Sequence, residues 1–162
     1  LAAGGPDGDV TVLAAHRLRE PDPGLSLRLP AAATALRQLR ARLADWLEGL
    51  GTSALDRVDT ELAVYEAAAN AILHGRPVQG EAAVTANVRL DGTGGVLIEV
   101  ADRGRWQPRT VGAGGDHQGG RGLAVISKVT DELSITPSPD GTTVIMRRGL
   151  THPVAVERTP ER

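Results

Sequence analysis

The sequence predicts an α+β fold, a two-layer α/β sandwich with helices on one face of a mixed, mostly antiparallel sheet. Two observations predict it. Apolar residues alternate at period 2 in several short segments, and they recur at intervals of 3 and 4 in three longer ones. In chain order these segments read strand, two helices, hairpin, loop, helix, hairpin, and hairpins indicate antiparallel pairing.

Composition excludes several classes of protein. With 162 residues, 41% hydrophobic, the chain is long enough for one domain with a buried core. The absence of cysteine excludes disulfide scaffolds, thiolate metal sites and cysteine nucleophiles. A net charge of −2 and only 2% aromatic residues argue against direct nucleic-acid binding. No apolar run approaches the length of a membrane span, so we expect no membrane contact and a cytoplasmic location.

The chain divides into three parts. Residues 1–24 hold a short strand-like run and a linker that two prolines and a glycine keep out of regular structure. Residues 25–150 form the domain, and residues 151–162 are expected to be a flexible tail. Because the sequence begins without methionine or a signal pattern, we expect it to be a piece of a longer cytosolic protein.

The first half of the domain reads as a strand followed by two helices. Leu25, Leu27 and Leu29 alternate with polar residues in a strand that Pro30 closes. A helix follows from residue 31 and ends at the glycines 49 and 51. A second helix begins near the N-cap candidates 52–53 and stops at 75–77. The apolar residues expected to form its buried stripe are spaced 3 and 4 apart: Leu55, Val58, Leu62, Tyr65, Ala69 and Ile72.

The second half reads as two hairpins separated by a long loop and a helix. Strands over 82–90 and 96–100 flank a turn rich in glycine and aspartate. The connector over 102–120 is rich in glycine, and so long a loop inside a compact domain is usually functional. A third helix over 123–130 precedes strands near 133–135 and over 142–147.

Three polar residues lie one turn apart on the second helix. Glu66, Asn70 and His74 are spaced i, i+4, i+8 and therefore share one side of the helix. A carboxylate can accept a proton from an attacking hydroxyl, and an asparagine oxygen can ligate Mg²⁺. Taken alone, the spacing is more typical of a solvated face, and a histidine at a helix end more often interacts with the last carbonyls.

Three further clusters follow along the chain. Asp102 ends a hydrophobic strand two residues before Gly104, where its carboxylate could accept a hydrogen bond from an exocyclic amine. Gly120 and Gly122 open the third helix, whose N–H groups suit a phosphate. Thr142 follows a glycine at the start of the last strand. Each cluster by itself is more typical of ordinary turns and strand starts.

The four clusters in this order resemble the N, G1, G2 and terminal GT motifs of the GHKL ATPase superfamily of gyrase, histidine-kinase and MutL type. Within it, "YEAAANAILHG", "VADRGRW", "GGRGLAVISKVTDEL" and "GTTVIMRR" resemble the anti-sigma-factor serine kinases of the SpoIIAB/RsbW type. The resemblance covers residues 25–148 and implies an ATP-binding fold of the Bergerat type, consistent with the element order above.

The resemblance implies a role for each matched residue. Glu66 corresponds to the general base and Asn70 to the Mg²⁺ ligand, with His74 in the same nucleotide-binding motif. Asp102 corresponds to the acceptor of the adenine amine, and Thr142 to its helper beside the base. The matched glycines would admit the adenine or contact the phosphates: Gly104, Gly120 and Gly122. Residues 107–119 would form the ATP lid.

One position departs from the family pattern. Trp106 stands where the second glycine of the G1 motif is usual, which puts the local geometry at the lid entrance in doubt. Residues 8–13, GDVTVL, resemble weakly the last strand of metal-dependent serine phosphatases of the SpoIIE/RsbU type. An exposed strand of any kind would look the same. If the likeness is meaningful, this chain is the kinase-like part of a phosphatase–kinase fusion.

The family implies a Mg²⁺- and ATP-dependent protein serine/threonine kinase that is also an anti-sigma factor. Its partners would be a STAS-type anti-sigma-factor antagonist, which it phosphorylates, a sigma factor, which it sequesters, and a second copy in a homodimer. Such proteins act in partner-switching stress or developmental pathways.

Two alternatives remain at this stage. The ATP-binding domain of a two-component histidine kinase uses the same motifs. It also needs an adjoining helix pair with a phosphoacceptor histidine, for which residues 1–24 are short and interrupted by proline. A non-catalytic adaptor that grips a sigma factor would keep the fold, while the presence of Glu66, Asn70 and Asp102 favours a competent enzyme.

Overall fold

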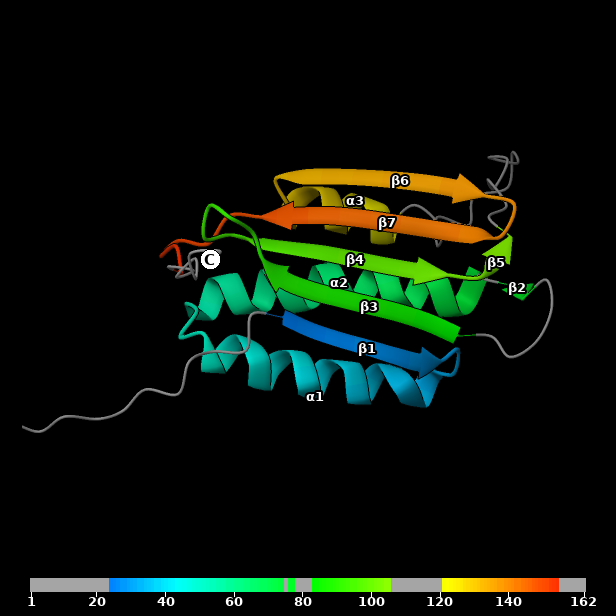
Figure 1. The fold of residues 1–162 in the computed structure, drawn as a ribbon, viewed down its shortest axis with the longest axis horizontal. Helices are drawn as coiled ribbons and strands as arrows, with labels where there is room; N and C mark the ends of the chain where they lie inside the picture. The colour runs from blue at the N-terminus through cyan, green and yellow to red at the C-terminus, as the bar shows by residue number, and fades with distance from the viewer. Residues whose placement is uncertain (1–23, 75, 78–82, 106–120, 155–162) are drawn as a thin grey trace, which may run out of the picture.

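The computed structural model describes residues 24–74, 76–77, 83–105 and 121–154. Figure 1 shows an open sheet with helices on one face, the two-layer arrangement that the sequence predicts. The sheet has five strands in the order β1-β3-β4-β7-β6, and each neighbouring pair is antiparallel. The predicted fold class is thus confirmed.

Element bounds follow the sequence prediction within a few residues. The helices are α1 (Ala33–Gly49), α2 (Ala54–His74) and α3 (Arg121–Val129). The strands of the large sheet are β1 (Gly24–Pro30), β3 (Ala83–Leu90), β4 (Val96–Asp102), β6 (Glu132–Ser138) and β7 (Gly141–Arg148). Among the described residues no helix is long and apolar enough to cross a membrane.

A second, two-stranded sheet was not predicted. It pairs β2 (Arg76–Pro77) with β5 (Gly104–Arg105), antiparallel. Strands of two residues that contain proline and glycine carry no periodicity, so the sequence gives no signal for them. The pairing holds the chain just after α2 against the chain just after β4, and it therefore fixes the end of one element beside the end of the other.

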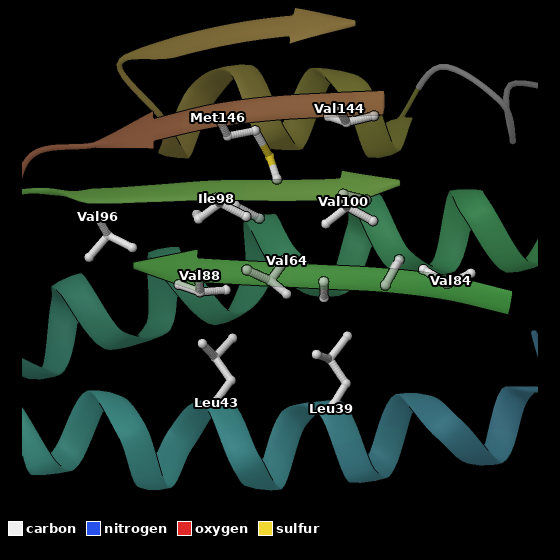
Figure 2. Close-up of a cluster of buried hydrophobic side chains, with 14 of the residues drawn as sticks. Leu39, Leu43, Val64, Val84, Val88, Val96, Ile98, Val100, Val144 and Met146 are labelled. Atoms are coloured by element: carbon white, nitrogen blue, oxygen red, sulfur yellow. The ribbon is translucent and has the colours of Figure 1, made fainter. Parts of the chain in front are cut away.

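The hydrophobic core lies between the helices and the inner face of the sheet (Figure 2). Alternate residues of β3 and β4 point inward, so that Val84, Ala86 and Val88 lie beside Val96, Ile98 and Val100. Leu39 and Leu43 of α1 meet them from the other layer. Period-2 burial in the strands against period-3.6 burial in the helices is the pattern that the sequence predicts.

The predicted buried stripe of α2 is wrong for most of its members, although Ile72 is partly buried and packs against the core. Leu55 is 63% exposed, Val58 60% and Tyr65 40%. The side of α2 that packs on the sheet is made instead of small side chains: Ala63, Val64, Ala67, Ala68 and Ala71. Small residues let α2 lie close to the strands, and because the helix carries apolar residues on two opposite sides, its period alone could not identify the inner side.

A buried aspartate anchors the N-terminal end of α2. Asp56 is 1% exposed, and Ser53 Oγ both donates to its carboxylate (2.7 Å) and accepts from its backbone N–H (3.1 Å), which confirms an N-cap at this point. The backbone N–H and hydroxyl of Thr151 also donate to Asp56, at 2.9 and 3.1 Å, as does Arg148 at 3.4 Å. Burial acts to raise the pKa of Asp56, but these hydrogen bonds outweigh it, and the pKa lies below its usual value. Residues 151–154 of the expected tail are therefore held to the domain, and 155–162 lie outside the described residues.

The β3–β4 turn is organised by Asp91. Its Oδ1 accepts from the backbone N–H of Thr93 and of Gly95, both at 2.8 Å, and its Oδ2 accepts from Arg147 Nε at 2.7 Å. Burial acts to raise the pKa of Asp91, but the hydrogen bonds from Thr93, Gly95 and Arg147 lower it from 3.8 to about 2.

Because of this turn, the free energy of unfolding should depend on pH under acidic conditions. Because the pKa of Asp91 is lower in the folded state, its stabilisation is fully present above the unfolded value of 3.8 and is lost as the pH falls toward 2. We expect the loss to be on the order of 2 kcal/mol in the free energy of unfolding, and Asp91→Asn to remove that part of the pH dependence. Urea unfolding between pH 5 and pH 2 measures it. Glu132→Gln, at an exposed site on β6, is the control. If the free energy of unfolding of Asp91→Asn fell with pH as steeply as that of the wild type, Asp91 would not be the source of this pH dependence.

Candidate functional site

Four elements meet at one end of the molecule, at the right of Figure 1. There α2 ends, β4 ends in Asp102, β7 begins and α3 begins. The β2–β5 pairing joins the chain after α2 to the chain after β4 at this same end. Each predicted site residue within the described ranges lies on one of these elements or on β5.

Glu66 and Asn70 lie against the first turn of α3. A Cβ added to Gly122 would come within 2.9 Å of Glu66 Oε2, 3.1 Å of Asn70 Nδ2 and 3.3 Å of Asn70 Oδ1. Glycine at 122 therefore lets the backbone of α3 approach both side chains more closely than any other residue would. Glu66 and Asn70 are half-buried, one turn apart on α2, as their spacing predicts.

Asp102 and Thr142 are direct cross-strand partners where two central strands of the sheet, β4 and β7, end and begin. They face each other in the antiparallel register of β4 and β7, and Thr142 is buried while Asp102 is half-buried. A Cβ on Gly141 would overlap the backbone carbonyl oxygen of Asp102. The start of β7 thus approaches the end of β4 as closely as it does because residue 141 is glycine.

Gly141 also belongs to the site, although the sequence indicates only that it precedes Thr142 at the start of the last strand. The signal was available in that dipeptide. A glycine directly before a strand residue indicates either a turn or a close approach, and only the pairing of β7 with β4 shows that it is a close approach.

The remaining predicted residues are only partly described. His74 is the last residue of α2 and Gly104 the first of β5, so their backbones lie at the same end of the sheet. Gly120, Trp106 and the expected lid over 107–119 lie outside the described residues.

Within the described ranges, no group of three or more histidine, aspartate or glutamate side chains could hold a metal ion. The oxygens of Glu66 and Asn70 are of the type that Mg²⁺ prefers, but two side chains are too few to bind it alone. A magnesium ion here would need further oxygens from a ligand, such as phosphate groups, and the donor set fits an ion that arrives with a nucleotide.

Gly122→Ala tests the contact between α3 and α2. Alanine is the better helix former, by about 1 kcal/mol, so the substitution alone should not weaken α3. Its methyl group would nevertheless displace Glu66 and Asn70, because the added Cβ would lie only 2.9 Å from Glu66 Oε2. We expect a roughly tenfold loss, equivalent to about 1.4 kcal/mol, in the rate of the phosphotransfer that the family resemblance implies, with little change in melting temperature.

Gly49→Ala is the matched control, because no atom lies within 4 Å of a Cβ at that position. Rate and melting temperature should be measured on both variants. Equal rates for Gly122→Ala and Gly49→Ala would show that the approach of α3 does not position the two α2 side chains.

Comparison with known proteins places this arrangement in a family. The family described as histidine kinase-like ATPase domain matches residues 29–148, which span β1 to β7 and include both residue pairs. The resemblance to GHKL-type ATPases is confirmed by this match.

Two solved structures are similar to the chain. The crystal structure of the RsbU and RsbW domains of Rv1364c from Mycobacterium tuberculosis aligns with 30% identity and a TM-score of 0.64, over 84% of this chain and 35% of that one. The histidine kinase domain of the blue-light activated histidine kinase of Erythrobacter litoralis EL346 aligns with 16% identity and a TM-score of 0.50, over 85% of this chain and 66% of that one. The second likeness concerns the fold alone. The chain spans about a third of the first structure, and it belongs to the histidine kinase-like ATPase domain family.

Proposed function

We propose that this domain is a Mg²⁺- and ATP-dependent protein serine/threonine kinase that also acts as an anti-sigma factor. The observation that carries the proposal is the close approach of Gly122 to Glu66 and Asn70, at the end of the sheet where Asp102 faces Thr142. The similarity to a structure that contains an RsbW domain supports a kinase of the anti-sigma type.

The pair Asp102 and Thr142 would hold the base of the nucleotide. A carboxylate accepts hydrogen bonds only, so Asp102 is suited to the exocyclic amine of adenine. Thr142 can accept or donate beside it, and its burial fixes its position. Gly104 would let the backbone approach the base.

The first turn of α3 would hold the phosphates. The backbone N–H groups at the start of a helix and the positive end of its dipole attract anions, and at Gly122 no side chain stands in the way. Gly120 and His74 are proposed to belong to the same binding region. Asn70 would supply an oxygen to Mg²⁺, which when bound offsets the negative charge of the phosphate oxygens.

Glu66 would act as the general base. Its carboxylate accepts the proton of a serine or threonine hydroxyl on the protein substrate, while the hydroxyl oxygen bonds to the γ-phosphorus and the bond from that phosphorus to the β-phosphate oxygen breaks. Because Glu66 Oε2 lies against the first turn of α3, the base and the proposed phosphate site share one boundary. Positioning and electrostatics of this kind provide most of the rate in phosphoryl transfer.

The proposed protein substrate is a STAS-type anti-sigma-factor antagonist, and the proposed sequestered partner is a sigma factor. We further propose that the protein acts in the cytoplasm, as a homodimer, in a partner-switching stress or developmental pathway. A fused serine phosphatase domain is a further proposal, supported by the likeness of residues 8–13 to such domains and by the RsbU domain in the similar structure.

Incubation with γ-labelled ATP and a panel of STAS proteins, followed by mapping of the label, tests the reaction. We expect label on a serine or threonine of one panel member, dependent on Mg²⁺. Label on a histidine would favour a histidine kinase, and binding of a sigma factor with no label on any protein would favour a non-catalytic adaptor. Either result would overturn the proposed reaction.

A further inference from the structure

The outward side of α2 is apolar although it faces solvent. Five residues form what we call the α2 ridge: Leu55, Val58, Leu62, Tyr65 and Ala69. Leu55 and Val58 are more than half exposed, and Leu73, one turn beyond the ridge, is 74% exposed. The core contacts of α2 are made by its opposite side, so the α2 ridge contributes nothing to the core of this domain. A continuous apolar stripe on the exposed side of a helix marks a surface that another molecule covers.

The spacing of the α2 ridge suits a second helix. Its members follow one another at intervals of 3, 4, 3 and 4, which is the a/d repeat by which two helices interlock along a seam. Large residues occupy its N-terminal half and Ala69 lies near its C-terminal end. An antiparallel pairing with an identical helix, centred on Leu62, would therefore place Leu55 of one copy over Ala69 of the other, large against small.

Charges on α1 favour the same antiparallel pairing. Two ion pairs, Arg40–Glu61 (3.5 Å) and Glu48–Arg57 (3.9 Å), show that α1 lies alongside α2 and runs in the opposite direction. The α1 residue level with Leu62 is therefore near Ala41, which is exposed and small. A twofold axis through Leu62 perpendicular to the helices would lay α1 over its own copy, centred on that alanine.

About that centre α1 is oppositely charged at its two ends. The exposed cations Arg37 and Arg40 lie on the N-terminal side, and the exposed acids Asp45 and Glu48 on the C-terminal side; a third exposed cation, Arg42, directly follows the central alanine. Within α1 no acidic residue precedes Asp45. The proposed axis brings Arg37 of each copy opposite Asp45 of the other, and neither side chain forms an ion pair within the described part of the chain. A surface that is complementary to itself in this way is what a twofold dimer requires.

We propose that the α2 ridge is the dimer interface of this protein and that its occupant is the α2 ridge of a second copy, antiparallel. Leu55, Val58, Leu62 and Tyr65 form the apolar centre, and reciprocal Arg37–Asp45 pairs form the rim. This interface assigns a surface to the homodimer of the proposed function, and it does not depend on phosphotransfer.

Sedimentation equilibrium of the 162-residue chain tests it, with the 16.9 kDa monomer as the reference mass. We expect a dimer whose dissociation constant rises at least about tenfold in Val58→Lys, because a charge would be buried in the apolar centre. Ile145→Lys, at an exposed apolar site on the sheet face away from the helices, is the matched control and should leave the dimer intact.

Variants that reverse the charges of Arg37 and Asp45 test whether these two residues pair across the interface. Arg37→Glu and Asp45→Arg should each weaken the dimer, since each places like charges opposite one another, and the double variant should restore it. ATP binding on the same samples separates this result from the proposed kinase function. A monomer at all concentrations would overturn the proposal, as would a dimer that survives Val58→Lys or a double variant that fails to restore pairing.

Discussion

Glu66→Gln should lose phosphotransfer while it retains nucleotide binding. Glutamine has the shape of glutamate, so the contact with Gly122 and the packing of α3 should persist. It cannot accept the hydroxyl proton, and the loss of a general base lowers rates by about 10²- to 10⁴-fold. The rate of label transfer to the proposed STAS substrate measures the first effect, and calorimetric titration with ATP measures the second.

Glu61→Gln is the matched control, since Glu61 lies on the same helix but pairs with Arg40 of α1 rather than with α3. It should keep the wild-type transfer rate. We expect Glu66→Ala to be as inactive as the glutamine variant. If wild type and Glu66→Gln transferred phosphate equally well, Glu66 would not be the base.

Asp102→Asn should weaken the binding of ATP by roughly 10- to 100-fold. A hydrogen bond to a charged acceptor contributes about 1.5–3 kcal/mol, and a neutral amide oxygen replaces only part of it. The substitution changes no side-chain volume, and Thr142 stays its cross-strand partner, so the sheet should remain intact. Binding of a sigma factor without nucleotide should change far less than ATP binding does.

The control is Asp140→Asn, in the exposed turn directly before β7, which removes a nearby charge without altering the end of β4. Titrations of both variants with ATP at one ionic strength separate the loss of a specific contact to ATP from a general change in the electrostatic potential around the site. Unchanged ATP affinity in Asp102→Asn would reject its role in binding adenine.

The strands and most helix bounds were predictable because their signals are local. Alternating residues in β3 and β4, the cap at Ser53 and the glycines at the end of α1 each specify structure through neighbours in sequence. The inner side of α2 was not predictable in this way. Its core contacts are made by alanines, which carry little weight in an apolar pattern, while its larger apolar residues face outward.

The site was predictable only in part, for a related reason. The spacing of Glu66 and Asn70 follows from helix geometry alone. Their contact with Gly122, and the overlap that a side chain at Gly141 would make with Asp102, depend on how distant segments pack. The anchor that joins Asp56 to Arg148 and Thr151 links residues more than 90 positions apart, and no local pattern indicates it.

A crystal structure with a non-hydrolysable ATP analogue and Mg²⁺ would show whether a single nucleotide occupies both residue pairs. We expect one nucleotide that spans them, with its adenine amine on the Asp102 carboxylate beside Thr142. Its phosphates should lie at the first turn of α3, with Mg²⁺ bridging them to Asn70. A nucleotide bound elsewhere, or one that reaches only one of the two pairs, would contradict this expectation.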